Sequence, residues 1–185
     1  LVFSLDTGVV RADSTKDREV VLGLLSGFEY IPTREALDTR FGEHSAAVLL
    51  AVLNDKVDPN ILSSHRRRAL KLLGLYDCQE FPNVASYLLS YIGSPSNSEQ
   101  SRHAAMTSLG QACKEKAVPE LSQHLSSDNL WLREGAIKGL EATGSLSALP
   151  RLEHALTQER EPQFQEKIHQ VIGRLKERPY HTPAP

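Results

Sequence analysis

The stretch AVPELSQHLSSDNLWLREGAIKGL, residues 117–140, decides the fold. Its first half carries apolar residues at helical spacing and places Pro119 in the first turn of a predicted helix, where the missing amide donor costs nothing. Its second half spaces Arg133, Ala136 and Leu140 three and four residues apart. Residues four apart lie on one helix face, and a small residue there lets a neighbouring helix approach closely. The stretch therefore predicts a hairpin of two packed helices.

The frame of the second helix recurs along the chain. It consists of an arginine, a small or apolar residue three positions later, a large apolar residue four positions after that, and usually a glycine. The small or apolar position is held by Leu37, Ala69, Ala105, Ala136 and Ile168, at steps of 32, 36, 31 and 32 residues. The first four copies carry the arginine, as Arg34, Arg66, Arg102 and Arg133, and the fifth has Gln165. The glycine, as in Gly110, suits a helix about to end. Such a period is typical of stacked helical repeats.

The repeat resembles the HEAT-repeat family, particularly the short variety named after phycobilisome lyases. The resemblance spans roughly residues 17–177 and is strongest in the third and fourth repeats. It implies an all-α fold, a right-handed α-solenoid of about five HEAT-like helical hairpins. The arginine-bearing second helices would line its concave side, and the shorter first helices its convex side. The residues that carry it are Ala117, Val118, Pro119, Glu120, Leu121, Leu125, Asp128, Leu132, Arg133, Ala136 and Leu140.

The predicted organisation has three parts. Residues 1–15 form an amino-terminal extension, extended or disordered, residues 16–178 form the solenoid, and residues 179–185 form a disordered tail. The longest purely apolar run, residues 46–53, is far shorter than the roughly 20 residues that a membrane-spanning helix needs. We therefore expect a soluble protein, and we favour the cytoplasm over the periplasm or secretion.

Composition and spacing also argue against several kinds of chemistry. The formal charge of −2 and the pI near 6.4 disfavour nucleic-acid binding. Cys78 and Cys113 stand 35 residues apart without zinc-site spacing. They lie near equivalent corners of adjacent repeats, so a disulfide is conceivable, but stacked hairpins usually hold such corners beyond bridging distance. A disulfide is therefore the less favoured alternative, and the redox state of the two cysteines stays open.

No enzyme site is predicted. The seven histidines show no metal-ligand spacing, and none lies directly before a glutamate. Deoxyhypusine hydroxylase, a HEAT-repeat enzyme that binds iron, uses such His-Glu pairs. There is no nucleophile elbow and no glycine-rich phosphate loop. Alkylpurine DNA glycosylases, which share HEAT-like repeats, use aromatic residues on a basic track; here Trp131 is the only tryptophan, and we interpret it as a packing residue or a partial interface anchor. We predict no catalytic residue, metal or cofactor.

The predicted function is that of a non-catalytic protein–protein interaction scaffold or adaptor that binds a partner segment in the concave groove. The expected contacts lie two residues either side of the small-residue position: Glu35, Thr39, Arg67, Lys71, His103, Thr107, Glu134, Lys138, Glu166 and Gln170. Basic character at Arg67 and Lys71 gives way to mixed charge toward Glu166, which predicts a partner of alternating or bipolar charge.

Other interpretations accompany this prediction. Arg34, Arg66, Arg102 and Arg133 are interpreted as a structural ladder that bonds within and between repeats. The basic run from His65 to Arg68 is a solvated helix start or, in the alternative, a contact for an acidic partner. Two other functions stay open: a phycobilin-lyase-like or other HEAT-repeat enzyme or chaperone factor, and a nucleic-acid-binding HEAT-like protein.

Overall fold

The computed structural model describes residues 14–27, 32–55 and 61–177. Every regular element in these ranges is helical, which confirms the predicted all-α solenoid. Apart from the first two residues of the first helix, the predicted extension 1–15 lies outside the described residues, as does the tail 179–185. The α-helices are α1 (Ser14–Ser26), α2 (Arg34–Phe41), α3 (Ser45–Asn54), α4 (Ser63–Leu73), α5 (Pro82–Gly93), α6 (Glu99–Cys113), α7 (Val118–Ser122), α8 (Leu130–Thr143), α9 (Leu149–Gln158) and α10 (Pro162–Glu177). Three 3₁₀ turns join them: η1 (Gly42–His44), η2 (Lys114–Ala117) and η3 (Leu146–Ala148).

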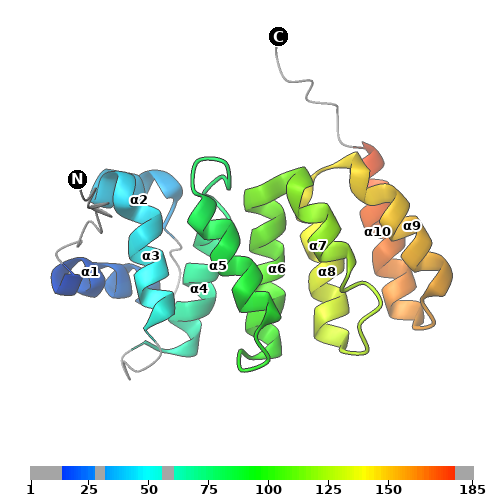
Figure 1. The fold of residues 1–185 in the computed structure, drawn as a ribbon, viewed down its shortest axis with the longest axis horizontal. Helices are drawn as coiled ribbons and strands as arrows, with labels where there is room; N and C mark the ends of the chain where they lie inside the picture. Colours follow the sequence, from blue (N-terminus) through cyan, green and yellow to red (C-terminus); the bar gives the residue numbers. More distant parts are fainter. Residues whose placement is uncertain (1–13, 28–31, 56–60, 178–185) are drawn as a thin grey trace, which may run out of the picture.

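From α3 onward the helices alternate between two layers (Figure 1). The hairpins are α3/α4, α5/α6, α7/α8 and α9/α10, and the two helices of each pack against one another. The second helices α4, α6, α8 and α10 also pack side by side in chain order. Each hairpin therefore completes its core with residues of its neighbours, as expected of stacked repeats.

Local signals set the bounds of these helices. Asn129 begins α8, because its side-chain oxygen accepts the backbone amides of Trp131, at 2.9 Å, and Leu132, at 3.3 Å. Gly144 ends the same helix in the left-handed conformation, with φ of 63°. Proline lies in the first turn of α7, where it was predicted, and of α5.

The small or apolar position of each repeat points inward. Leu37, Ala69, Ala105, Ala136 and Ile168 are at most 1% exposed. The predicted orientation of the repeat is thereby confirmed. The burial of three alanines in this row means that the second helices meet at small side chains.

The glycines of the repeat have a role beyond the one predicted. Gly110 lies inside α6, and a Cβ atom there would lie 2.0 Å from the carbonyl oxygen of Gly139 in α8. A Cβ at Gly139 would lie 2.8 Å from the carbonyl oxygen of Met106. Gly110 lies in the last turn of α6, as predicted, since the helix ends at Cys113. Its further role is to let two helix backbones touch. Gly42 follows α2 with φ of 57° and ends that helix, which also agrees with the prediction.

The amino-terminal end departs from the predicted repeat. Helix α2 runs through η1 into α3, and α1 packs on α3 and α4. The pair α1/α2 is not a close hairpin like the four that follow. The apolar side chains of Val21 and Leu25 in α1 are buried, so α1 covers the exposed side of the first regular hairpin.

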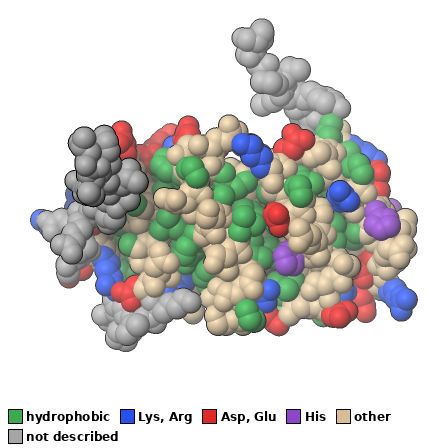
Figure 2. All heavy atoms as spheres, in the orientation of Figure 1, with side chains coloured by type: hydrophobic (Ala, Val, Ile, Leu, Met, Phe, Trp, Pro, Cys, Tyr) green, Lys and Arg blue, Asp and Glu red, His purple; other side chains and the backbone are tan. Residues whose placement is uncertain are grey.

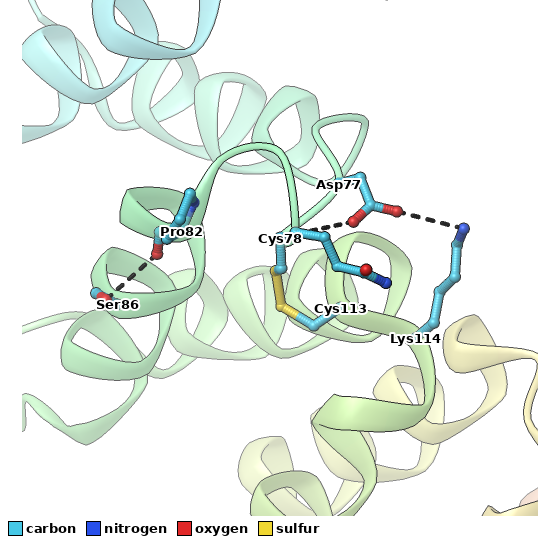
Figure 3. Close-up of a disulfide and its surroundings, with 7 residues drawn as sticks. Asp77, Cys78, Pro82, Ser86, Cys113 and Lys114 are labelled. Carbon is cyan, nitrogen blue, oxygen red and sulfur yellow. Dashed lines mark hydrogen bonds and ion pairs between the residues drawn. A yellow bond between two sulfur atoms is a disulfide. The ribbon is translucent and has the colours of Figure 1, made fainter.

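A disulfide joins Cys78 and Cys113, whose Cα atoms are 5.0 Å apart (Figure 3). The expectation that these corners lie beyond bridging distance is wrong, because the corner between α4 and α5 lies directly against the end of α6. The backbone amide of Cys78 donates to the carbonyl of Ala112 at 3.1 Å. Beside it, Asp77 pairs with Lys114 at 3.5 Å. The bond therefore fastens one repeat to the next.

Candidate protein-binding face

The surface formed by the second helices is called the second-helix face here, and it is defined by ten residues. Trp131 and Lys167 belong to it, together with eight of the residues predicted from the sequence. All are exposed or half-buried on four successive stacked helices. The eight are Arg67 and Lys71 on α4, His103 and Thr107 on α6, Glu134 and Lys138 on α8, and Glu166 and Gln170 on α10.

The remaining two predicted contacts lie elsewhere. Glu35 and Thr39 are exposed on α2, which packs on η1 and α3 and does not extend the row of second helices. The sequence frame repeats in α2, but the stacking does not. The structure therefore brings together the predicted contacts of four repeats and separates those of the first.

The two layers of the solenoid are packed to different degrees. The second helices α6 and α8 touch through their backbones, whereas the first helices α5, α7 and α9 do not pack closely on one another. The second helices therefore form the more closely packed of the two layers.

Trp131 and His103 form the centre of the second-helix face. Their ring centroids are 6.1 Å apart and the rings are nearly perpendicular, at 87°. Gly135 allows this approach, because a Cβ there would lie 2.7 Å from the sulfur of Met106. Burial lowers the pKa of His103, and the charge of Lys138 lowers it further, so its ring is neutral at pH 7. Trp131 stays 41% exposed and offers an apolar surface beside a neutral ring.

Sequence reasoning treated Trp131 as a packing residue or partial anchor and left it out of the contact set. Helical spacing could have included it, because Trp131 precedes Glu134 by three residues and Lys138 by seven. Residues at these spacings share one face of a helix.

The charges of α8 and α10 largely neutralise each other. A carboxylate oxygen of Glu134 lies 2.7 Å from the ammonium of Lys167 and 3.5 Å from that of Lys138. The hydrogen bond from Lys167 is the main reason why the pKa of Glu134 falls below its ordinary value. Arg174 pairs in the same way with Glu141, at 2.5 Å. This half of the face has most of its charge already engaged.

The charges of α4 are not engaged in this way. Within the described ranges, neither Arg67 nor Lys71 has an acidic side chain within ion-pair distance. Their neighbour Arg68 differs, because its guanidinium donates to the carbonyl oxygens of Leu25 and Gly27 at the end of α1. Of the basic run from His65 to Arg68, only Arg67 therefore belongs to the second-helix face, where Lys71 accompanies it.

The arginines of the repeat bond to the backbone. Arg34 donates to the backbone carbonyl of Leu75, in the corner after α4, and also to the carboxylate of Glu80. The other three donate to carbonyl oxygens at or after the end of the preceding first helix: Arg66 to Leu53 and Asp55, Arg102 to Ile92, and Arg133 to Ser127 in the turns that follow α7. These hydrogen bonds tie the guanidinium groups to the fold.

A groove of about 700 Å³ lies between α7 and α9, and none of the predicted contacts lines it. Helix α7 has only five residues, so the chain continues to α8 as turns and leaves space beside α9. The turn-forming run from Ser126 to Asn129 was the available sequence signal. The basic side chains of Arg151 and Arg160 are balanced there by Asp128 and Glu161, so the groove has no net preference for charge.

The first helices present a different surface from the second helices. Figure 2 shows it in the orientation of Figure 1, with apolar side chains visible between the helices. In the part of this face that is not grey, acidic side chains gather at the upper left, and basic side chains lie apart from one another. A row of basic charges comparable to Arg67 and Lys71 is not seen among the described residues of this view.

A serine and a histidine meet between α1 and α4, but the histidine donates to the serine, which does not suit nucleophilic catalysis. The Oγ of Ser26 lies 3.0 Å from Nε2 of His65. The other ring nitrogen, Nδ1, accepts the backbone amide of Leu62, so Nε2 carries the proton and donates to Ser26. The hydroxyl of Ser26 donates in turn to the carbonyl of Leu22 at 2.6 Å. His65 therefore cannot take a proton from Ser26, and the pair ties two helices together.

Neither a metal-binding group nor a membrane-spanning helix is found in the described ranges. Within residues 14–27, 32–55 and 61–177, His, Cys, Asp and Glu side chains do not gather in threes in a way that could hold a metal ion. In the same ranges, no helix is both long enough and apolar enough to cross a bilayer.

Residues 86–173, from within α5 to within α10, match the family model of HEAT repeats. Over this segment the chain is similar to HEAT repeats. The segment includes the contact between α6 and α8 and the pair of Trp131 and His103. Helix α4, which carries Arg67 and Lys71, precedes the matched segment. It packs on α6, which lies within that segment. No curated protein matches the chain.

Proposed function

We propose that the protein is a non-catalytic scaffold that binds a segment of another protein along the second-helix face. The observation that carries the proposal is the row of exposed and half-buried side chains on four stacked helices, with the large apolar surface of Trp131 at its centre. HEAT repeats commonly serve as protein-interaction scaffolds. Exposed tryptophans near the middle of a surface are frequent anchors of protein interfaces.

The packing beneath this face also supports the proposal. Backbone contact between α6 and α8 holds His103 and Trp131 at a fixed spacing before any partner arrives. A surface that does not have to be ordered on binding loses less entropy, and more of the contact energy appears as affinity.

An unbiased peptide selection tests the proposal. Random 12-residue peptides are selected on the native protein, and the winners are measured against Trp131→Ala, the double variant Arg67→Glu/Lys71→Glu, and the control Arg151→Glu/Arg160→Glu. The control makes the same charge change in the groove between α7 and α9.

We expect Trp131→Ala to weaken the selected peptides by about 10- to 30-fold, the effect of removing an interface anchor. The double reversal on α4 should weaken them as well, and the groove control should leave affinity within about twofold. Peptides that are insensitive to both changes on the second-helix face would refute the proposal.

We also propose that the repeats belong to a particular type of HEAT-like repeat. The proline in the first turn of α7 and of α9 supports the short type of repeat named after phycobilisome lyases. The rival function that accompanies this type is bilin handling. A bilin-handling protein would become coloured on incubation with a linear tetrapyrrole, whereas the scaffold is expected to remain colourless.

The disulfide supports a proposal about the compartment. Disulfides persist in oxidising compartments and are rare in the cytosol, so the bond between Cys78 and Cys113 favours an oxidising environment over the cytoplasm. Peptide mapping of protein isolated in the presence of an alkylating agent tests this. We expect a linked peptide pair; alkylation of both cysteines without prior reduction would contradict it.

A further inference from the structure

We infer that the segment bound on the second-helix face is acidic and carries a bulky apolar side chain about six residues from its acidic end. The inference rests on the proposed function and names the chemistry of the partner. Its acidic residues would lie over α4, and its apolar side chain against Trp131 on α8.

The first step is the distribution of unengaged charge. Arg67 and Lys71 lie on adjacent turns of α4 and point to the same side. Neither has an acidic partner within the described residues. On α8, Glu134 is shared by two lysines, so one positive charge there is also incompletely balanced. The chain as a whole carries a formal charge of −2, yet this part of its surface is positive. Complementary charge on a partner is therefore negative.

The sequence predicted a partner of alternating or bipolar charge. Such a partner would place a basic group opposite Glu134. In the structure a basic group would have to displace Lys167 at 2.7 Å and Lys138 at 3.5 Å from that carboxylate. Replacing one ion pair by another adds little affinity. Glu166 remains on α10, where it accepts a hydrogen bond from Gln170, but the segment need not extend that far.

The exposed indole of Trp131 is the apolar contact site, called the apolar seat. Trp131 exposes 41% of its surface and stands edge-to-face with His103. The charged groups that influence His103 are Lys71, Lys138, Lys167 and Glu134, so the seat is bordered mainly by cations. An apolar side chain covers the indole there, while carboxylates on either side of it meet the surrounding lysines.

The last step is the span. Packed helices lie about 8 to 10 Å apart, so α4 and α8 are separated by about 16 to 20 Å across the face. An extended chain advances about 3.3 to 3.6 Å per residue. Five or six residues therefore cover the distance from the acidic end to the apolar side chain.

The test uses a 13-residue peptide whose central phenylalanine is separated by four Gly or Ser residues from a pair of glutamates at each end, so that either chain direction fits. One control peptide replaces the glutamates by lysines, and another replaces the phenylalanine by serine. Binding is followed by the emission of Trp131, the only tryptophan in the chain.

We expect saturable binding of the acidic phenylalanine peptide, and affinity at least 10-fold lower for each control peptide. Arg67→Gln/Lys71→Gln should reduce binding of the acidic peptide about 10-fold, and Arg151→Gln/Arg160→Gln should leave it unchanged. Equal binding of the acidic and basic peptides, or no saturable change up to millimolar concentration, would overturn the inference.

The two proposals fail separately. If the unbiased selection yields peptides that depend on Trp131 but are basic or uncharged, the scaffold stands and the acidic partner is refuted. If no selected peptide depends on the second-helix face, both fail. A dodecamer of deoxythymidylate that binds this face more tightly than the acidic peptide, with strong salt dependence, would identify a nucleic-acid surface and also overturn the inference.

Discussion

The two layers of this solenoid are built from the same hairpins but packed in opposite ways. In the second-helix layer, α6 and α8 approach until the backbones meet at Gly110 and Gly139. In the first-helix layer, α7 and α9 leave a groove of about 700 Å³ between them. Glycine and alanine on one side, and a shortened helix on the other, account for the unequal packing. The regular face is therefore the one formed by the second helices, where equivalent side chains of successive repeats come together.

The largest effect on the free energy of unfolding should come from a substitution that forces α6 and α8 apart. Gly110→Ala places a methyl group 2.0 Å from the carbonyl oxygen of Gly139, and neither backbone can move without disturbing the stack. We expect a loss of about 3 to 4 kcal/mol in the free energy of unfolding, measured by chemical denaturation.

Gly173→Ala is the matched control for that variant. Gly173 lies inside α10, and a Cβ there would meet no atom within 4 Å. Alanine is the better helix former, so this change should stabilise the protein by about 0.5 to 1 kcal/mol. Similar effects of the two substitutions would mean that α6 and α8 are not in backbone contact.

The next effect concerns the tie between successive repeats. Cys78→Ser/Cys113→Ser removes a link across 35 residues of chain, and we expect a loss of about 3 kcal/mol in the free energy of unfolding. Thermal unfolding with and without a dithiol reductant measures it. The native protein should lose stability on reduction, whereas the double variant should not respond; a native protein that does not respond would contradict the bond.

A smaller effect on stability should come from an ion pair that lines the groove between α7 and α9. Arg133 pairs with Glu159 at 3.2 Å, where both side chains are largely buried, and lies over the ring of Phe164. Arg133→Met keeps much of the packing but removes the ion pair with Glu159, whose carboxylate then keeps only the backbone amides of Arg160 and Glu161, and the loss should be about 2 kcal/mol. The exposed pair of Lys176 and Glu153 is the control, and Lys176→Met should cost less than about 0.5 kcal/mol.

A double-variant cycle sharpens that comparison. Adding Glu159→Gln to Arg133→Met removes the orphaned charge and should recover part of the loss. If the two losses simply add, the pair does not interact and the wall of the groove is held by packing alone.

The smallest effect is a dependence on pH. Because the folded-state pKa of Glu134 lies below its ordinary value of 4.5, the stability it contributes is present above pH 4.5 and is lost as the pH falls through the folded value. Lys167→Gln should therefore cost about 0.5 kcal/mol at pH 7 and progressively less below pH 4.5. Denaturant unfolding of both proteins between pH 3 and pH 7 measures it, and a difference that is constant across this range would contradict the pairing.

The sequence predicted what depends on helical period alone. The inward direction of Ala69, Ala105 and Ala136 followed from spacing, as did the succession of hairpins. The row of residues two positions away, such as Arg67 and His103, followed from the same register. Periodicity sets which side of each helix faces the core, so these features need no knowledge of how the helices stack.

The rest depends on distances between repeats, which period does not determine. The glycines of the repeat were assigned only to helix ends, because the sequence pattern does not show how closely the neighbouring helix approaches Gly110. Cys78 and Cys113 were expected to lie apart because the fold of the corner after α4 was not visible in the pattern. Helix α2 carries the repeat frame, but Gly42 turns the chain into α3, so α1 takes the place next to α4.

Photo-cross-linking of a selected peptide tests the central claim most directly. A photoreactive group replaces the apolar side chain of the tightest peptide from the unbiased selection, and the cross-linked residues are mapped by mass spectrometry. The account predicts cross-links at Trp131 and His103, with further contacts on α4. Cross-links confined to α7 and α9, or to the other first helices, would contradict it.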